Sequence, residues 1–243
     1  MLDTIVCIGD SLTQHGYDVS QRGWVSQLAF AYIRRFDVVN CGFSGFTTRW
    51  ALPLMPQVLT PSKPKILTIL FGSNDALLPS HPRHVPIDEF KSNIERMLAM
   101  AAEASPETKV ILITPPSLGE KLYATYDKDT FRTFECVKEY ADVVRDIARK
   151  QSVACADLWT AVETRAKEIG GELDGYDSFS YDGVHLNAGG NDLLFSILMQ
   201  TIKQDLPALH RSSIPLVVPY HKEIDSAIAD GVDVDVAVLK QAK

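Results

Sequence analysis

Short apolar runs alternate with amphipathic helical patterns along most of this sequence, and that alternation limits the possible folds more than any other feature. Five runs have the length of strands, at 5–8, 38–41, 66–71, 110–113 and 153–156, and the continuous apolar run 66–71 suits a strand covered on both faces. Apolar residues recur at helical spacing between and after them, at 24–32, 86–104, 131–150 and 188–205. The alternation predicts an α/β fold, because parallel strands need a crossover helix between them.

We expect a three-layer α/β/α sandwich, in which helices cover both faces of a five-stranded, mostly parallel, doubly wound sheet. Ligands in such folds bind beyond the carboxyl ends of the strands. The segments that directly follow each strand are therefore the first places to look for a functional site.

The last part of the sequence differs in character from the rest. It contains Pro215 and Pro219 and continues into an alternating apolar and acidic stretch, 232–236. We expect residues 1–206 to form the domain. Residues 207–243 are expected to be an extension that packs on this domain or on a second subunit, the latter giving a homodimer.

The composition is that of an ordinary soluble globular protein, with 46% hydrophobic and 23% charged residues. The net charge of −7 argues against nucleic acid or an anionic membrane as the main partner, since both attract basic faces. No apolar run approaches the length of a membrane span, and no secretory signal is recognisable, so we expect no stable membrane insertion. Four scattered cysteines without metal or disulfide spacing indicate a cytoplasmic, reducing environment.

Ser11 follows the first predicted strand, in the segment Gly9–Thr13. A serine in a tight strand-to-helix turn can present its hydroxyl at the edge of the sheet, with its backbone N–H directed into the same space. The segment also fits an ordinary helix N-cap, because Asp and Ser are common there. Taken alone, it leaves both interpretations open.

Two further segments end predicted strands with residues suited to a binding site. Gly42 and Gly45 permit a sharp turn and a close approach of the backbone to a ligand. Asn74 carries an amide that can donate a hydrogen bond to a developing oxyanion. Either segment alone could equally be an ordinary loop.

Asp182 and His185 lie just before the last predicted helix of the domain. Their spacing around a turn lets the carboxylate reach the imidazole, so that Asp182 holds the ring while His185 accepts a serine proton. A lone histidine at this place is more often a surface or capping residue. The six histidines show no zinc-ligand spacing, and we expect neither a metal site nor a cofactor.

Together, and in this order, the segments resemble the sequence blocks of the SGNH (GDSL) hydrolase family. The matching blocks are Gly9-Asp10-Ser11-Leu12, Asn40-x-Gly42-x-x-Gly45, Gly72-Ser73-Asn74-Asp75 and Asp182-Gly183-Val184-His185. The resemblance spans residues 9–185 and implies the flavodoxin-like SGNH hydrolase fold.

The same resemblance implies a role for each matched position. Ser11 would be the nucleophile, His185 the general base and Asp182 the residue that orients it. The oxyanion hole would consist of the backbone N–H groups of Ser11 and Gly45 together with the Asn74 amide.

A narrower resemblance, to isoamyl acetate-hydrolysing esterases, lies in residues 42–52, GFSGFTTRWAL, and in residues 85–94. It implies a serine esterase that hydrolyses short-chain carboxylic esters such as isoamyl acetate through an acyl-enzyme, with a small-molecule ester as its partner. A thioesterase, a lysophospholipase and a sugar O-deacetylase share this site chemistry and stay open as alternatives. A non-catalytic binding protein on the same fold is the alternative from another class.

The lining of a substrate pocket is the least constrained part of the site. Phe46, Trp50 and Leu77 follow the oxyanion segments and are candidates for an apolar lining, although plain core packing is the competing interpretation. We expect Arg49 to pair with a nearby carboxylate rather than to bind substrate.

Overall fold

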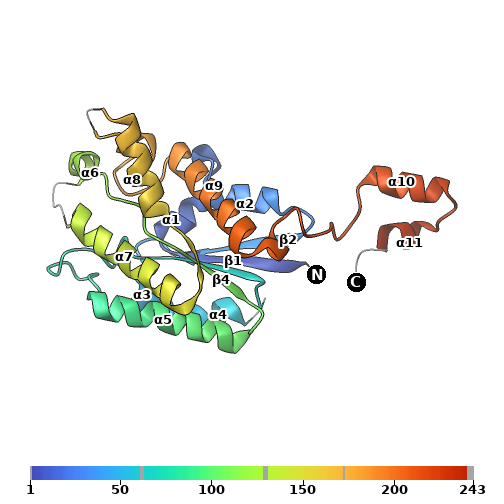
Figure 1. Cartoon of the computed structure of the whole chain (residues 1–243), viewed down its shortest axis with the longest axis horizontal. Coiled ribbons are helices and arrows are strands. Elements are labelled where there is room, and N and C mark those ends of the chain that lie inside the picture. The colour runs from blue at the N-terminus through green and yellow to red at the C-terminus, as the bar shows by residue number, and fades with distance from the viewer. Residues whose placement is uncertain (1, 61–62, 128–130, 172, 240–243) are drawn as a thin grey trace.

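The computed structural model describes residues 2–60, 63–127, 131–171 and 173–239 (Figure 1). Its centre is a sheet of five strands: β1 (Asp3–Gly9), β2 (Phe36–Gly42), β3 (Ile66–Leu70), β4 (Lys109–Ile113) and β5 (Ala154–Ala156). The strand order is β2-β1-β3-β4-β5, and each pair of neighbours is parallel. The predicted doubly wound sheet is therefore confirmed, and its strands lie within two residues of the predicted runs at either end.

Helices cover both faces of the sheet, as a three-layer sandwich requires (Figure 1). One layer contains α3 (Thr48–Ala51), α4 (Met55–Leu59), α5 (Ile87–Ala104) and α7 (Phe134–Gln151). The other contains α2 (Trp24–Ala31), α8 (Leu158–Ile169) and α9 (Ala188–Asp205). Side chains of β3 alternate between the two cores, so that Leu67 and Ile69 join the first and Ile66 and Leu70 the second.

The long helices correspond to the predicted helical patterns 86–104, 131–150 and 188–205. Helix α7 begins where the Thr133 side chain accepts a hydrogen bond from the backbone N–H of Cys136, a typical N-cap. It ends at Ser152, whose backbone is left-handed with φ of 54°. Among the described residues, no helix is both long and apolar enough to cross a membrane.

The remaining α-helices of the described part of the chain are short: α1 (Ser11–Gln14), α6 (Glu120–Tyr126), α10 (His221–Ala229) and α11 (Val234–Leu239). Helix α1 starts after the end of β1 with one residue between them, and α9 starts after the loop that follows α8. These two connections carry the residues predicted to react.

The C-terminal extension begins on the surface of the domain and then leaves it. The backbone N–H of Val217 donates to the Arg34 carbonyl at 2.9 Å, and the Arg35 guanidinium donates to the Ile214 carbonyl at 2.9 Å. Beyond this anchor, α10 and α11 stand clear of the sandwich (Figure 1). The division at residue 206 and the contact with a second subunit stay predictions, and residues 240–243 lie outside the described residues.

Candidate active site

Ser11 is the first residue of α1, immediately after β1. The helix is capped by the preceding residue, because the Asp10 carboxylate accepts a hydrogen bond from the Leu12 N–H at 2.9 Å. The Ser11 hydroxyl is consequently free of capping, and its Oγ lies 2.9 Å from the Nε2 atom of His185. Of the two interpretations of this segment, helix capping thus applies to Asp10, while the Ser11 hydroxyl is left in contact with His185.

His185 is held by the carboxylate three residues before it. The His185 Nδ1 atom lies 2.6 Å from Asp182 Oδ2, and the other carboxylate oxygen accepts the backbone N–H groups of Val184 at 3.0 Å and His185 at 2.7 Å. Gly183 makes this tight turn with φ of +85°, a conformation that L side chains rarely adopt. The structure therefore brings Ser11, His185 and Asp182 into one hydrogen-bonded series.

The Asp182 carboxylate favours its charged form. Burial alone would raise its pKa, but hydrogen bonds from the His185 ring and from the backbone N–H groups of the turn outweigh burial, so the pKa is lowered. A charged carboxylate on Nδ1 keeps the proton on that nitrogen and leaves Nε2 to accept the serine proton. It also stabilises the imidazolium that would form.

Two more rings lie beside the His185 imidazole, and the sequence analysis assigned neither a role. The His15 ring centroid is 5.5 Å away with an interplanar angle of 18°, and the Tyr181 centroid is 5.7 Å away at 13°. Such stacked contacts restrict how far the His185 ring can rotate. His15 is the C-cap of α1 and Tyr181 immediately precedes Asp182, but neither residue belongs to a matched sequence block.

The predicted oxyanion-hole residues lie on neighbouring loops. Gly45 has φ of +78°, and within the described ranges neither its N–H nor that of Ser11 donates to a protein acceptor. Asn74, only 4% exposed, donates from Nδ2 to the Phe46 carbonyl at 3.0 Å. The loop of Gly45 is tied to α1 because the Ser44 N–H donates to the Gln14 side chain at 2.8 Å. Two free N–H groups and one amide are therefore available to an oxyanion.

A buried carboxylate fixes the loop of Gly45 against the loop of Asn74. Asp75 accepts hydrogen bonds from the backbone N–H of Thr48 at 2.9 Å and from its hydroxyl at 2.5 Å. Burial, with a smaller contribution from the nearby Asp10, outweighs the hydrogen bonds from Thr48 and raises the pKa of Asp75 to about 7. Burial likewise raises the pKa of Asp10 to about 6. Two buried carboxyl groups, Asp10 and Asp75, are thus adjacent in sequence to Ser11 and Asn74.

Two arginines that the sequence analysis did not select approach the Asn74 amide oxygen. Arg132 Nη2 lies 2.9 Å from Asn74 Oδ1, and Arg83 Nη1 lies 3.5 Å from the same atom. Both arginines belong to loops outside the matched sequence blocks, so no local signal could have identified them. Only the packing of distant loops brings the two guanidinium groups together.

The predicted pocket residues have different surroundings. Phe46 lies between Phe43 and Trp50, with ring centroids 5.1 and 5.8 Å away, and Trp50 is 46% exposed. Leu77 is only 2% exposed and belongs to the core, so it offers little surface to a substrate. The predicted pairing of Arg49 is confirmed, since its guanidinium donates to both Glu89 oxygens at 2.6 and 2.7 Å.

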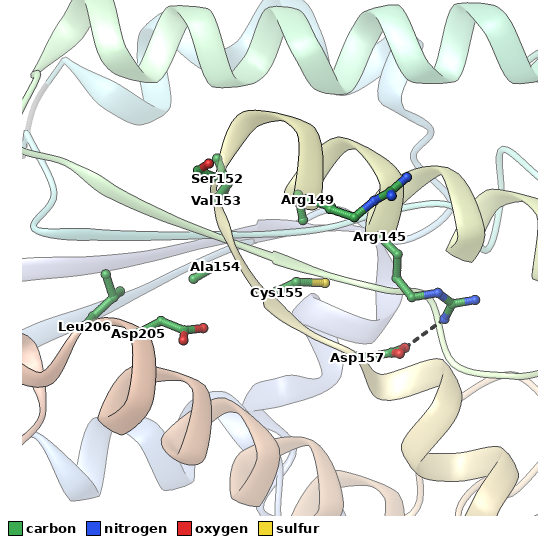
Figure 2. Close-up of a pocket in the computed structure, with 10 residues that line it drawn as sticks. Arg145, Arg149, Ser152, Val153, Ala154, Cys155, Asp157, Asp205 and Leu206 are labelled. Carbon is green, nitrogen blue, oxygen red and sulfur yellow. Dashed lines mark hydrogen bonds and ion pairs between the residues drawn. The ribbon is translucent and has the colours of Figure 1, made fainter.

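A surface hollow lies away from these residues, beside the edge strand β5 (Figure 2). Its lining contains none of the active-site residues described above, and it includes the ion pair of Arg145 with Asp157 at 2.9 Å. Charged side chains at a sheet edge discourage pairing with another strand, which gives this ion pair a structural role. Because the hollow contains none of the predicted reactive residues, we place the chemistry at the Ser11 site. Over the ranges that the structure describes, no group of three or more His, Cys, Asp or Glu residues is arranged to hold a metal ion.

Comparison with known proteins points to one family. The model of the GDSL-like lipase/acylhydrolase family matches residues 7–193. An "isoamyl acetate-hydrolyzing esterase 1 homolog" of Bos taurus is 35% identical over 236 residues, covering 92% of this chain and 88% of its own. A GDSL esterase/lipase of Arabidopsis thaliana is 31% identical, covering 93% of this chain and 95% of its own. The crystal structure of a lipase/acylhydrolase from Enterococcus faecalis has the same fold, with a TM-score of 0.65 at 24% identity, covering 88% of this chain and 98% of its own.

Proposed function

Because the chain belongs to the GDSL-like lipase/acylhydrolase family and is a carboxylic ester hydrolase, we propose that it hydrolyses short-chain esters, such as isoamyl acetate, through an acyl-enzyme on Ser11. The observation that carries this proposal is the series from Ser11 Oγ through the His185 ring to the Asp182 carboxylate, with contacts of 2.9 and 2.6 Å. A serine so placed beside an oriented base has the arrangement of an activated nucleophile.

In the acylation step, His185 Nε2 takes the Ser11 proton as Oγ attacks the ester carbonyl carbon. The carbonyl oxygen becomes an oxyanion that accepts the N–H groups of Ser11 and Gly45 and the Asn74 amide. The tetrahedral intermediate then collapses, the bond to the alcohol oxygen breaks, and His185 donates its proton to the departing alcohol. The product of this step is an acyl ester of Ser11.

Deacylation repeats the same chemistry with water as the nucleophile. His185 removes a proton from water, which attacks the acyl carbonyl, and the oxyanion hole is occupied a second time. Collapse returns the proton from His185 to Ser11 Oγ and releases the carboxylic acid. Asp182 stays charged throughout and stabilises the imidazolium in both steps.

The preference for short acetate esters is supported by the relatives and by the site. Mammalian relatives are named for isoamyl acetate hydrolysis, and the segment GFSGFTTRWAL supplies both Gly45 and the aromatic pair Phe46 and Trp50. We propose that the exposed part of Trp50 contacts the small apolar alcohol group of the ester.

A hydrolysis panel tests the proposal. Wild type and Ser11→Ala would be assayed with p-nitrophenyl esters from acetate to palmitate and with isoamyl acetate. We expect fast turnover of acetate esters by wild type and almost none by the variant. A preference for long acyl chains would replace the proposal with a lipase or lysophospholipase function, and substantial activity of the variant would contradict the role of Ser11.

The alternatives on the same scaffold are separated by substrate class. Acyl thioesters and acetylated sugars would be added to the panel, because a thioesterase or a sugar O-deacetylase would use the same residues. A fluorophosphonate label on Ser11 distinguishes a working hydrolase from a binding protein, since the label needs an activated serine.

The four cysteines are free, which supports the proposed cytoplasmic location.

A further inference from the structure

Two guanidinium groups meet at the Asn74 side of the oxyanion hole. Arg132 and Arg83 both approach Asn74 Oδ1, at 2.9 and 3.5 Å. Their charges have the same sign, and each contributes to the electrostatic surroundings of the other. Two cations in one partly buried place repel each other unless something compensates them.

Each of the three guanidinium nitrogens of Arg132 donates a hydrogen bond to the protein. Its Nε donates to the Ser73 carbonyl at 3.1 Å, Nη2 to Asn74 Oδ1, and Nη1 to the Tyr123 hydroxyl at 3.3 Å. The same hydroxyl donates to the Asp127 carboxylate at 2.6 Å, so a negative charge lies one residue beyond the guanidinium. Arg132 therefore has a structural explanation.

Arg83 lacks comparable partners. Its two hydrogen bonds, from Nη1 to the Gly45 carbonyl and to Asn74 Oδ1, are both long at 3.5 Å. Nε and Nη2 donate to no acceptor in the part of the chain that the structure describes, and no carboxylate there forms an ion pair with Arg83. Burial and the charge of Arg132 lower the pKa of Arg83, as expected for an uncompensated cation.

The position of Arg83 relates this uncompensated charge to the reaction. Its Nη1 lies 3.1 Å from the place where a Cβ atom on Gly45 would stand, so the guanidinium borders the loop that supplies an oxyanion-hole N–H. Arg49, by contrast, is neutralised by both oxygens of Glu89. A half-buried guanidinium with unused donors suits an oxygen pair on the substrate, because its N–H groups match a carboxylate in geometry.

We propose that Arg83 binds an anionic group on the alcohol part of the ester, so that the favoured substrates are acetate esters of short hydroxy acids. This inference rests on the proposed function, in which the acyl group is a small acetyl. The anion therefore belongs to the alcohol side. Arg83 borders two residues of the oxyanion hole, so only a short spacer separates the anion from the scissile bond.

The chemistry is unchanged by this recognition. Ser11 takes the acetyl group, the hydroxy acid leaves with the proton from His185, and water then releases acetate and restores the serine. Arg83 forms no covalent bond and gives up no proton. Its effect is to hold the carboxylate of the substrate while the acetyl group is transferred.

A pair of matched esters tests the proposal. Isoamyl acetate and 3-acetoxypropanoate have the same spacer and nearly the same shape, with two methyl groups in the first replaced by two carboxylate oxygens in the second. Values of kcat/KM would be measured for both on wild type, Arg83→Gln and Arg83→Lys. Arg49→Gln is the control, because it removes one positive charge near the same loop from an arginine with a protein partner.

We expect Arg83→Gln to lower kcat/KM for 3-acetoxypropanoate tenfold to about a hundredfold, the range for a lost hydrogen bond to a charged group. Isoamyl acetate turnover should change less than about threefold. Arg83→Lys should keep part of the preference, and higher salt should weaken it for wild type. Arg49→Gln should change the ratio between the two esters little.

Equal losses on both esters would overturn the inference and make Arg83 a support of the oxyanion loop. No change on either ester would overturn it as well. In both cases turnover of isoamyl acetate by wild type would leave the proposed function standing. Turnover of neither ester by wild type would reject the proposed function together with the inference.

Discussion

Arg132 Nη2 lies 2.9 Å from Asn74 Oδ1, and this contact decides which end of the Asn74 amide faces the reacting groups. A guanidinium can only donate hydrogen bonds, so the amide oxygen must face Arg132. The amide nitrogen then faces the loop of Gly45, where it donates to the Phe46 carbonyl. We therefore propose that Arg132 is a positioning residue for the predicted oxyanion hole.

Replacing Arg132 by Gln should lower kcat about tenfold and leave KM nearly unchanged. The reason is that the Asn74 amide loses the charged donor that orients it, and an oxyanion-hole donor acts mainly in the transition state. Steady-state kinetics with a p-nitrophenyl acetate substrate would give both constants.

A double-mutant cycle distinguishes positioning from a general structural role. Asn74→Ala alone should lower kcat on the order of 100-fold. Adding Arg132→Gln to that variant should then cost little more, because the amide to be oriented is gone. Full additivity of the two losses would contradict the assignment.

Asp182→Asn should lower kcat on the order of 10³- to 10⁴-fold while the fold is kept. The amide oxygen can still accept the backbone N–H groups of Val184 and His185, but its NH₂ group would face His185 Nδ1. The ring would then carry its proton on Nε2 and could not accept the serine proton. Kinetics and thermal unfolding would be measured together, and a loss of activity that merely follows unfolding would count against this explanation.

Asp75→Asn should remove a pH-dependent part of the folding stability. Burial raises the pKa of Asp75 to about 7, well above its value in an unfolded chain. The protonated form therefore contributes stability that is fully present below about pH 4 and is lost as the pH rises through about 7. Urea unfolding at pH 5, 6.5 and 8 should show wild type losing stability relative to the variant as the pH increases.

The control for this experiment is Asp88→Asn, which removes an exposed carboxylate from the first turn of α5. It leaves the two buried acids untouched and should not reproduce the effect. A wild type that gained stability relative to Asp75→Asn between pH 5 and 8 would show that the sign of the pKa shift is wrong.

Removing residues 221–243 tests the predicted role of the extension. The anchor between Arg35 and Ile214 is kept in this variant, so the domain should unfold at nearly the same temperature. If the extension joins two subunits, light scattering should show twice the monomer mass for the full chain and the monomer mass for the shortened one. A monomer in both cases would reject the homodimer.

The sheet and the long helices could be predicted because their residues carry the burial pattern locally. Every residue of β3 is buried, and its continuous apolar run gives a clear strand signal. Helix α8 was not selected, although Trp159, Val162 and Ala166 have helical spacing and are buried. The alternating stretch 232–236 has the period of a strand, yet α11 begins within it, and no strand among the described residues pairs with it.

The candidate site could be predicted only where chemistry and sequence order coincide. Ser11, Asn74, Asp182 and His185 stand in short motifs at strand ends or before a helix, and the structure brings Ser11, His185 and Asp182 into hydrogen-bonding contact. Arg83 and Arg132 reach the site from loops without a motif, so their convergence depends on tertiary packing. The exposure of individual side chains could not be predicted either, because it also depends on tertiary packing. Leu77, a candidate for the pocket lining, is therefore found in the core.

Ser11 and His185 lie 174 positions apart, although their side chains are in hydrogen-bonding contact. During synthesis the proposed nucleophile emerges among the first residues, while its proposed base emerges only with the loop that precedes α9. A nascent chain therefore carries an inert serine until the domain is almost complete. On refolding, the return of esterase activity would report the docking of this last connection rather than the formation of the sheet.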